Sequence, residues 1–379
     1  MSGEGGDVDQ DVVNHWTENV LPTILERYSE DDIYNADETG LFYCMQPSRT
    51  MHYRGERCTG GKQSKERLSV LVCANMSGTE KSKLLVIGKS EKPRCFKNVK
   101  TLPVVYRNNT KAWMTSSIFL EWLKSMDKKF RVEKRHCVLL IDNCPSHPNP
   151  LPFPLTNLTI HFLPKNTTSH TQPCDAGIIR DLKRKYRTRL VKRMLAQIEA
   201  SPTASNYKPN VLDAIRMVSA AWDEVKPDTV KNCFRKAGWR KGDENSTDLN
   251  DDEDDIPLAV LRERLSLPET MTFEDYINVD SDLATEEVLT EDELFASLRT
   301  TPQTTQGKEE EEEEEDEENQ TENPVCSLAD AKVHLQEVRR YLETCSHTSE
   351  IDFRSISALE SSLLQTFAQK QKSIRDFFH

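Results

Sequence analysis

Two short apolar runs constrain the fold of this chain more than any other feature. Residues 68–74 (LSVLVCA) and residues 137–141 (CVLLI) contain no charged side chain. An apolar run of this length without alternation is typical of a strand that is buried on both faces. The second run stops at Asp-Asn-Cys-Pro, which begins at Asp142 and favours a turn. The sequence therefore predicts a covered sheet whose strands end in polar side chains.

The order of the other expected elements indicates the class of fold. Further strands are expected at residues 33–37, 83–87 and 158–163. Helices are expected at residues 117–130, 176–200, 211–225 and 229–237, and a short helix broken at Pro22 is expected within residues 11–29. In the helix at 117–130, Ser117 is the expected N-cap, and one face carries Phe119, Trp122, Leu123 and Met126. This order is an α/β pattern that starts antiparallel and continues parallel.

The charge of the chain is segregated along its length. The net charge is −13, and it divides into −6 for residues 1–30, +19 for residues 31–242 and −26 for residues 243–379. A basic block between acidic ends is typical of a protein that binds a polyanion such as DNA. The alternative is that the acidic runs are only solvated tails.

Composition then divides the chain into five parts. Hydrophobic residues make up 36% of the chain and charged residues 30%, which is too polar for one globule of 379 residues. We expect an N-terminal linker or helix (1–30), a folded domain (31–242), an acidic linker with short helices (243–300), a disordered acidic run (301–325) and a helical segment with a C-terminal tail (326–379). The run from Glu309 to Glu318 consists of ten consecutive acidic residues.

Several classes of protein are excluded by missing signals. No stretch reaches the roughly 18 apolar residues that a membrane span needs, and the N-terminus lacks the apolar segment of a secretory signal. The ten cysteines form no C-x-x-C pair, so neither a disulfide framework nor a structural zinc site is expected. We expect the cysteines to be reduced thiols. There is no G-x-S-x-G or P-loop motif, and nothing in the sequence indicates a lowered pKa for Cys174.

Three aspartates follow predicted strands or begin a predicted helix. Asp37 ends the first expected strand, Asp142 directly follows a buried strand, and Asp175 begins the basic helix at 176–200. Carboxylates that converge at strand ends repel one another and favour a hard divalent cation between them. Taken alone, each residue also fits a turn or helix-cap role, so spacing by itself leaves both interpretations open.

Four longer motifs resemble a known family. They are NADETGLFY (35–43), LLIDNCPSH (139–147), FLPKNTTSHTQPCDAGII (162–179) and NCFRKAGW (232–239). In order and spacing they resemble the DDE-type integrase core of the pogo and Tigger transposases, which belong to the mariner-type superfamily. Residues 272–294 are also similar to the tail of that family, so the resemblance covers roughly residues 11–300.

The resemblance implies a fold, a site and a chemistry. The implied fold is an α/β, RNase-H-like (integrase-core) mixed sheet flanked by helices, followed by an acidic, largely disordered C-terminal region. The implied catalytic and metal-binding residues are Asp37, Asp142 and Asp175, with 104 and 32 residues between them. They would hold two Mg²⁺ or Mn²⁺ ions for DNA nicking and strand transfer in the nucleus, with Asn143 and His147 as neighbours of no assigned role.

The chain also departs from the family's pattern. Members normally carry a pair of N-terminal helix-turn-helix domains, and this chain is expected to lack them, through domestication or through a truncated gene model. The family's FLPPNTTS and LQP stretches are altered at Lys165, His170 and Thr171, but no acidic residue of the three is lost. We therefore expect that the chemistry survives while site-specific targeting is lost.

The helix at 176–200 is the expected DNA contact. Its basic residues Lys183, Arg184, Lys185, Arg187 and Arg189 surround an apolar stripe and are expected to bind backbone phosphates without reading sequence. The alternative is a solvated basic face.

The C-terminus carries a second candidate binding motif. Gln371, Ile374, Phe377 and Phe378 form Q-x-x-I-x-x-F-F, which resembles the peptide box that binds the replication sliding clamp, proliferating cell nuclear antigen. One helical turn would present the apolar anchors to a pocket on the clamp. The alternative is a docked C-terminal helix whose Phe pair packs against the core.

Two functions are consistent with these features. The first is a transposase-derived nuclear enzyme that nicks and joins DNA with its three aspartates and divalent cations. The second is a domesticated, non-catalytic protein that binds DNA and acts through its acidic tail and clamp-binding motif.

Overall fold

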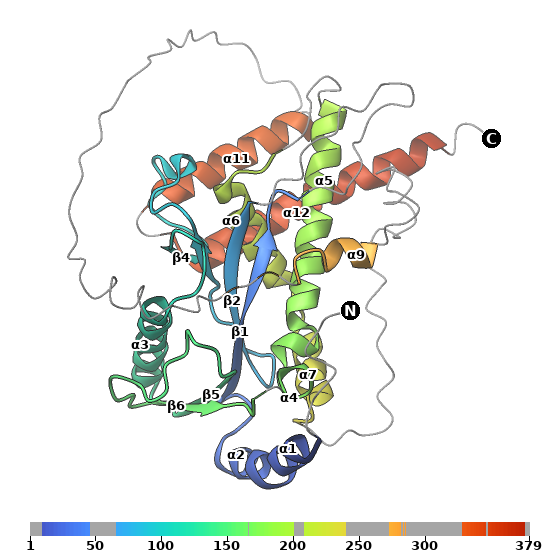
Figure 1. Cartoon of the computed structure of the whole chain (residues 1–379). Coiled ribbons are helices and arrows are strands. Elements are labelled where there is room, and N and C mark those ends of the chain that lie inside the picture. Colours follow the sequence, from blue (N-terminus) through green and yellow to red (C-terminus); the bar gives the residue numbers. More distant parts are fainter. Residues whose placement is uncertain are drawn as a thin grey trace.

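The computed structural model of the chain describes residues 10–45, 66–165, 167–200, 208–239, 273–281, 283, 285, 328–345 and 348–375. Its centre is a mixed sheet of six strands (Figure 1). The strands are β1 (Ile33–Phe42), β2 (Arg67–Asn75), β3 (Leu85–Gly88), β4 (Val105–Asn108), β5 (Cys137–Ile141) and β6 (Leu158–Phe162).

The strand order is β4-β3-β2-β1-β5-β6. The pairs β1–β2 and β2–β3 are antiparallel, whereas β1–β5 and β5–β6 are parallel. This order confirms the predicted antiparallel start and parallel continuation, and with it the RNase-H-like mixed sheet. The short edge strand β4 runs parallel to β3 and was not expected from the sequence, because its VYRN segment carries no apolar run.

The two faces of the sheet pack against different helices. One face, which includes Ile33 and Leu41 of β1, packs against α5 (Ile179–Ala200), α6 (Val211–Glu224) and α7 (Pro227–Lys236). The other face, which includes Tyr34 and Ala36, packs against α3 (Ser116–Glu133). Since successive side chains of a strand point to opposite faces, odd-numbered residues of β1 face α5 and even-numbered residues face α3.

The helices agree with the expected ones except at their ends. In α3 the predicted face is buried, but the cap is Thr115, whose hydroxyl accepts from the Ile118 N–H at 3.3 Å, and Ser117 lies inside the helix. The N-terminal segment forms α1 (Gln10–His15), the π-helix η2 (Trp16–Val20) and α2 (Leu21–Arg27), with Pro22 in the first turn of α2. The remaining short elements are η3 (Arg94–Phe96), α4 (Thr168–Thr171), η4 (Cys174–Ile178) and α9 (Phe273–Ile277). No helix within the described ranges is long and apolar enough to cross a membrane.

Two C-terminal helices, α11 (Leu328–Thr344) and α12 (Glu350–Arg375), lie against the domain that holds the sheet (Figure 1). The carbonyl of Glu343 accepts from the backbone N–H groups of Lys100 and Thr101, and its carboxylate pairs with Arg216 of α6. Phe353 and Ile356 of α12 are buried. The expected helical segment is therefore docked on the domain, through ion pairs that supplement a small apolar contact.

Candidate active site

Asp37 lies inside the central strand and not at its end. The sequence placed the end of the strand at residue 37, but β1 continues to Phe42 because its second half pairs with β2, where Asp37 faces Val72. The parallel partner β5 pairs only with Ile33, Tyr34 and Asn35. Asp37 is therefore the first α5-facing side chain beyond the point where β5 leaves β1, which puts it at the carboxyl edge of the parallel pair.

The other two aspartates come from the neighbouring segments. Asp142 directly follows β5, as predicted. Asp175 lies in η4, a single π-helical turn that precedes α5. Gly177 lies inside η4 with a φ of 151°, a backbone conformation that is strained for a residue with a side chain. This glycine lets the chain change direction between Asp175 and the helix.

The carboxyl groups of these aspartates meet around Asp37. Burial raises the pKa of Asp37 well above its ordinary value, and the nearby carboxylates of Asp175 and Asp142 raise it further, as does a hydrogen bond with Asp175. Asp37 is buried, Asp142 is partly exposed and Asp175 is exposed. The arrangement is therefore a carboxylate cluster that is closed at Asp37 and open to solvent at Asp175.

The donor set of this cluster fits a hard divalent cation. Its oxygens are carboxylates, the ligands that Mg²⁺ and Mn²⁺ prefer. Because burial and the charges of Asp175 and Asp142 raise the pKa of Asp37, a cation among these groups would favour the charged carboxylate. Asp37, Asp142 and Asp175 are thus the residues that would hold such an ion.

Glu38, the residue after Asp37, is a further carboxylate beside the cluster that was not predicted from the sequence. It is the next residue of β1, so its side chain lies on the opposite face of the sheet from Asp37. Its Oε1 lies 3.2 Å from Nε2 of His147, and both side chains are only 1% exposed. Glu38 is part of the NADE motif, but no rule of residue spacing predicts which acid within a strand is buried.

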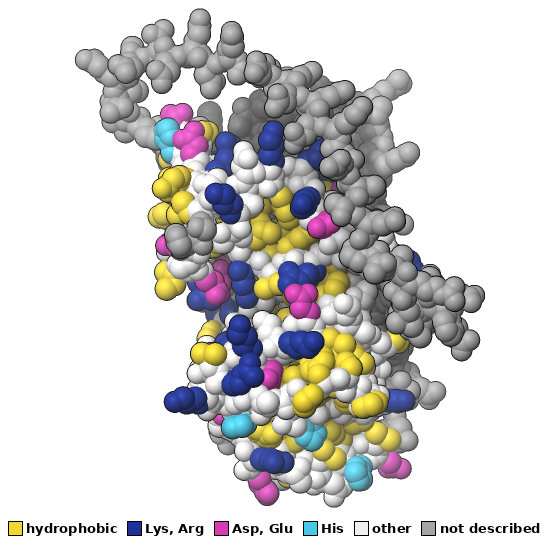
Figure 2. All heavy atoms as spheres, turned by 90° about the vertical axis from the view of Figure 1, so that its left-hand side faces the viewer, with side chains coloured by type: hydrophobic (Ala, Val, Ile, Leu, Met, Phe, Trp, Pro, Cys, Tyr) yellow, Lys and Arg dark blue, Asp and Glu magenta, His cyan; other side chains and the backbone are white. Residues whose placement is uncertain are grey.

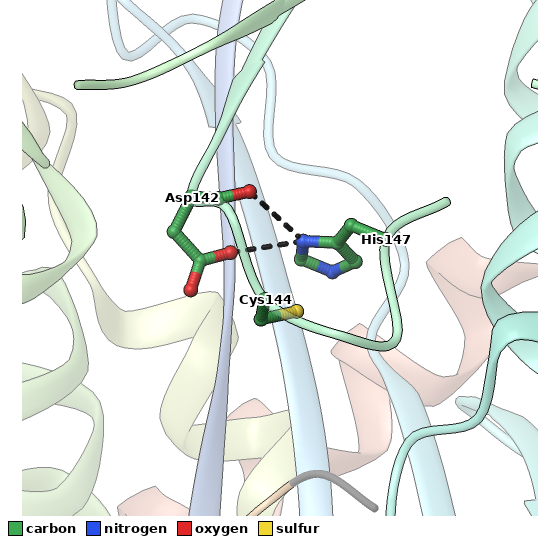
Figure 3. Close-up of side chains that lie close together, drawn as sticks. All are labelled: Asp142, Cys144 and His147. Atoms are coloured by element: carbon green, nitrogen blue, oxygen red, sulfur yellow. Dashed lines mark hydrogen bonds and ion pairs between the residues drawn. The ribbon is translucent and has the colours of Figure 1, made fainter. Parts of the chain in front are cut away.

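His147 is held between two carboxylates. Its Nδ1 lies 2.9 Å from Oδ1 of Asp142, across the turn that follows β5 (Figure 3). Burial alone would lower the pKa of His147, but the charge of Glu38 and the hydrogen bond with Asp142 raise it well above the ordinary value. The ring also packs against Phe119 of α3, with 4.0 Å between the ring centroids. Asn143 lies in the same turn and donates a hydrogen bond from its amide to the carbonyl of Leu163.

Cys174 is not an activated nucleophile. It is fully buried, and burial together with the charge of Asp37 raises the pKa of its thiol well above the ordinary value. The expectation from sequence that this pKa is not lowered is confirmed.

The basic residues of α5 are mostly paired inside the protein. Lys183 and Arg187 bind the two carboxylate oxygens of Asp280, at 2.7 and 2.6 Å, and the side chain of Asp280 is fully buried. Arg189 is also largely buried and pairs with Glu224 at 2.5 Å. The segment after α9 and the end of α6 thus supply counterions to these three residues inside the protein. Their expected contact with DNA remains a prediction.

Arg184 and Lys185 are also ion-paired, through Asp181 one turn earlier, at 2.9 and 3.7 Å. Their side chains are 22% and 16% exposed, so part of each reaches solvent. Their predicted role in DNA binding stays a prediction.

Exposed basic side chains gather elsewhere, over α3 and the segment between β3 and β4 (Figure 2). Between residues 89 and 100 the exposed cations are Lys89, Lys92, Arg94, Lys97 and Lys100, and Glu91 is the exposed acid. On α3 and its C-cap, the exposed cations are Lys124, Lys128, Arg131 and Lys134. We call residues 89–100 the basic segment.

The clamp-binding motif falls largely outside the described residues. Gln371 and Ile374 belong to the backbone of α12, which ends at Arg375, and Phe377 and Phe378 lie beyond the described residues.

Comparisons with known proteins show what this chain is similar to. A family model described as DDE superfamily endonuclease matches residues 65–234. Tigger transposable element-derived protein 4 from Mus musculus is 36% identical over 281 residues, which are 73% of this chain and 54% of that protein. ARS-binding protein 1 from Schizosaccharomyces pombe is 35% identical over 65% of this chain and 49% of that protein. The chain thus spans about half the length of these curated relatives.

A solved structure, the Mos1 strand transfer complex, has a TM-score of 0.35 and 12% identity, and the match covers 63% of this chain and 62% of that chain. The fold is assigned from the strand order, independently of this likeness. The family model shows a DDE superfamily endonuclease domain in this chain, over residues 65–234, and the relatives show that the chain is similar to the Tigger transposable element-derived proteins.

Proposed function

We propose that this domain nicks and joins DNA with divalent cations bound by Asp37, Asp142 and Asp175. The observation that carries the proposal is the environment of Asp37, whose pKa is raised by burial and by the carboxylates of Asp175 and Asp142. A buried acid near two other carboxylates is costly to fold, and it is typical of a site where charge is balanced by a ligand.

The chain's own residues define what such a site would do. A pair of Mg²⁺ or Mn²⁺ ions, when bound, supplies an activated attacking oxygen and stabilises the leaving oxygen of a phosphodiester. Asp37 provides the rigid, buried ligand because it sits in the central strand. Asp175, which is exposed, gives the substrate phosphate an approach to the cluster from solvent.

The basic segment is our proposed surface for the DNA backbone. Its cations are exposed, in contrast to Lys183, Arg187 and Arg189 of α5, and one acidic side chain interrupts them. Contacts of this kind bind phosphate without reading sequence and weaken as salt is raised.

A nicking assay on supercoiled plasmid with Mg²⁺ or Mn²⁺ tests the catalytic proposal. Asp37→Asn, Asp142→Asn and Asp175→Asn should each abolish nicking. Asp228→Asn is the matched control, because the side chain of Asp228 on α7 is 72% exposed and distant in sequence from the cluster. If the Asp142 variant nicks as well as the parent protein, the site is assigned wrongly.

A second function, DNA binding without cleavage, is supported by a different observation. The name of one relative, ARS-binding protein 1, describes binding and not catalysis. On this proposal the carboxylate cluster is a remnant, and the exposed basic segment carries the activity. Strand transfer that depends on the cations and on the three aspartates would exclude it.

We further propose that the protein acts in the nucleus and that its C-terminal Q-x-x-I-x-x-F-F motif binds the sliding clamp, proliferating cell nuclear antigen. The support is the motif itself, whose first two residues, Gln371 and Ile374, lie in the last turns of α12.

A further inference from the structure

The turn from Asp142 to His147 brings three different ligand atoms together. The Asp142 carboxylate, the Cys144 thiol and a ring nitrogen of His147 all lie within 4.8 Å of one another (Figure 3). The backbone makes this possible, because the N–H of His147 donates to the carbonyl of Cys144 at 3.0 Å and so closes the turn. Oxygen, sulfur and nitrogen donors are thus presented by one short segment.

Glu38 orients the ring of His147 for such a site. Its Oε1 lies 3.2 Å from Nε2, so a proton on Nε2 is stabilised there. Nδ1 faces the Asp142 carboxylate at 2.9 Å, and an ion bound to both groups would replace the proton between them. A ligand histidine whose other nitrogen donates to a carboxylate is a recurrent arrangement in zinc proteins. Phe119 packs on the ring and fixes its plane.

We propose that Asp142, Cys144 and His147 bind one Zn²⁺ ion, with solvent as the remaining ligand. Thiolate and imidazole donors favour Zn²⁺ over Mg²⁺, and three protein ligands plus water is a common zinc coordination. Solvent reaches the site beside Asp142, whose side chain is 22% exposed, whereas Cys144 and His147 are buried.

Cys144 has to bind the ion as a thiolate, because the thiolate and not the thiol is the metal ligand. A coordinating cation deprotonates a thiol on binding. A thiolate signal in the presence of metal is therefore a specific report of Cys144 coordination.

The proposed zinc site shares Asp142 with the proposed catalytic cluster. Asp37 serves the cluster from one face of β1, and Glu38 supports the zinc site from the other. Since one carboxylate cannot serve both sites fully, Zn²⁺ should inhibit nicking that depends on Mg²⁺ or Mn²⁺. This last consequence rests on the proposed function, whereas Zn²⁺ binding does not.

Cobalt is the probe for the ligand set, because Co²⁺ replaces Zn²⁺ in such sites and shows a thiolate-to-metal absorption band. The full chain, stripped with a chelator, should develop this band on addition of one equivalent of Co²⁺ and lose it when Zn²⁺ is added. Cys144→Ser should lack the band, while Cys95→Ser, at a half-buried cysteine outside the turn, should keep it.

The affinity of the turn for Zn²⁺ is measured by titration against a chromophoric chelator. The same titration tests whether the zinc site is independent of the aspartate cluster. Glu38→Gln should lower Zn²⁺ affinity about 10–100-fold, and Cys144→Ser at least as much. Asp37→Asn should abolish nicking and leave the cobalt band intact, which separates the two sites. A parent protein without a thiolate band overturns the proposal, as does unchanged Zn²⁺ affinity in Cys144→Ser.

Discussion

The side-chain oxygen of Asn35 accepts a hydrogen bond from the backbone N–H of Cys174 at 2.8 Å, which ties the central strand to the turn that carries Asp175. The amide nitrogen of the same side chain donates to the carbonyl of Leu140 at 3.0 Å, two residues before Asp142. Asn35 itself lies two residues before Asp37 on the same face of β1. One fully buried side chain therefore joins the three segments that bear the acidic residues.

Asn35→Ala should impair the cluster more than the fold. Its loss leaves a buried N–H and a buried carbonyl with one partner fewer, which costs about 1–3 kcal/mol for each group left unsatisfied. We expect weaker Mn²⁺ binding and at least tenfold slower nicking. Asn75→Ala is the matched control, since Asn75 is equally buried at the end of β2 and bonds to Asp31 and Thr79. It should lower stability in urea without a change in Mn²⁺ affinity, and equal loss of affinity in both variants would contradict the positioning role.

Asp280→Asn should be among the most destabilising single substitutions in the chain. The variant keeps the shape of the side chain but leaves Lys183 and Arg187 as buried cations without a counterion. Breaking a buried ion pair in this way costs about 3–5 kcal/mol. The measurement is the midpoint of urea unfolding, with the exposed Asp228→Asn as a control expected to change stability by less than about 0.5 kcal/mol. A small effect at Asp280 would mean that its segment does not dock on α5 in solution.

Replacement of Lys92, Arg94 and Lys97 by Gln should weaken DNA binding across all sequences. Each lost phosphate contact should reduce the slope of log affinity against log salt by about 1. The double variant Arg184→Gln with Lys185→Gln is compared with it, because these residues belong to the α5 surface that the sequence predicted to bind DNA. If only the α5 pair changes the salt slope, the basic segment is not the DNA surface.

The acid stability of the domain should depend on Glu80. Burial would raise its pKa, but hydrogen bonds from Lys129, Tyr34 and Arg135 outweigh burial and lower it from 4.5 to about 2. Because the folded-state pKa is the lower one, the stabilisation is complete above about pH 4.5 and is lost as the pH falls toward 2. A shift of this size corresponds to at most about 3 kcal/mol.

Urea unfolding at several pH values checks this prediction. The parent protein should lose stability between about pH 4.5 and 2. Glu80→Gln should be less stable at neutral pH and should show a flatter dependence in that window. An unchanged pH profile in the variant would assign the acid transition to other carboxyl groups.

Phe377→Ala with Phe378→Ala should abolish binding to the sliding clamp. Loss of an aromatic anchor commonly costs about 2 kcal/mol or more, which is roughly thirtyfold in affinity for each residue. The full chain and a peptide of residues 366–379 are compared by calorimetry, and DNA affinity should be unchanged in the double variant. If clamp binding persists, the motif is a coincidence.

The sheet could be predicted because buried strands leave a strong pattern. The apolar runs at 68–74 and 137–141 became β2 and β5, and the position of Asp142 followed directly. The extent of β1 was missed because its second half, with Asp37 and Glu38, is polar. It is a strand only because β2 supplies the backbone partners, and such a tertiary effect leaves no local signal.

The basic helix shows why charge alone does not locate a binding surface. A run of Lys and Arg in α5 predicts a solvated or phosphate-binding face, and the sequence does not reveal that Asp280 lies against it. Contacts between residues 93 or more positions apart, such as Arg187 with Asp280, depend on the docking of a distant segment. The three aspartates were found through a resemblance of motifs, whereas Glu38, one residue from Asp37, was not.

The alternation of side chains along β1 also limits how such a chain can change by mutation. A single substitution can remove the Asp37 carboxylate and leave the contact between Glu38 and His147 intact, or the reverse. A lineage can therefore lose one of these two features and keep the other. Insertion or deletion of one residue near Asp37 would instead exchange the faces of these two acids, since the period of a strand is two. Related proteins that keep only one of the two features should therefore differ by substitutions, and their β1 strands should have the same length.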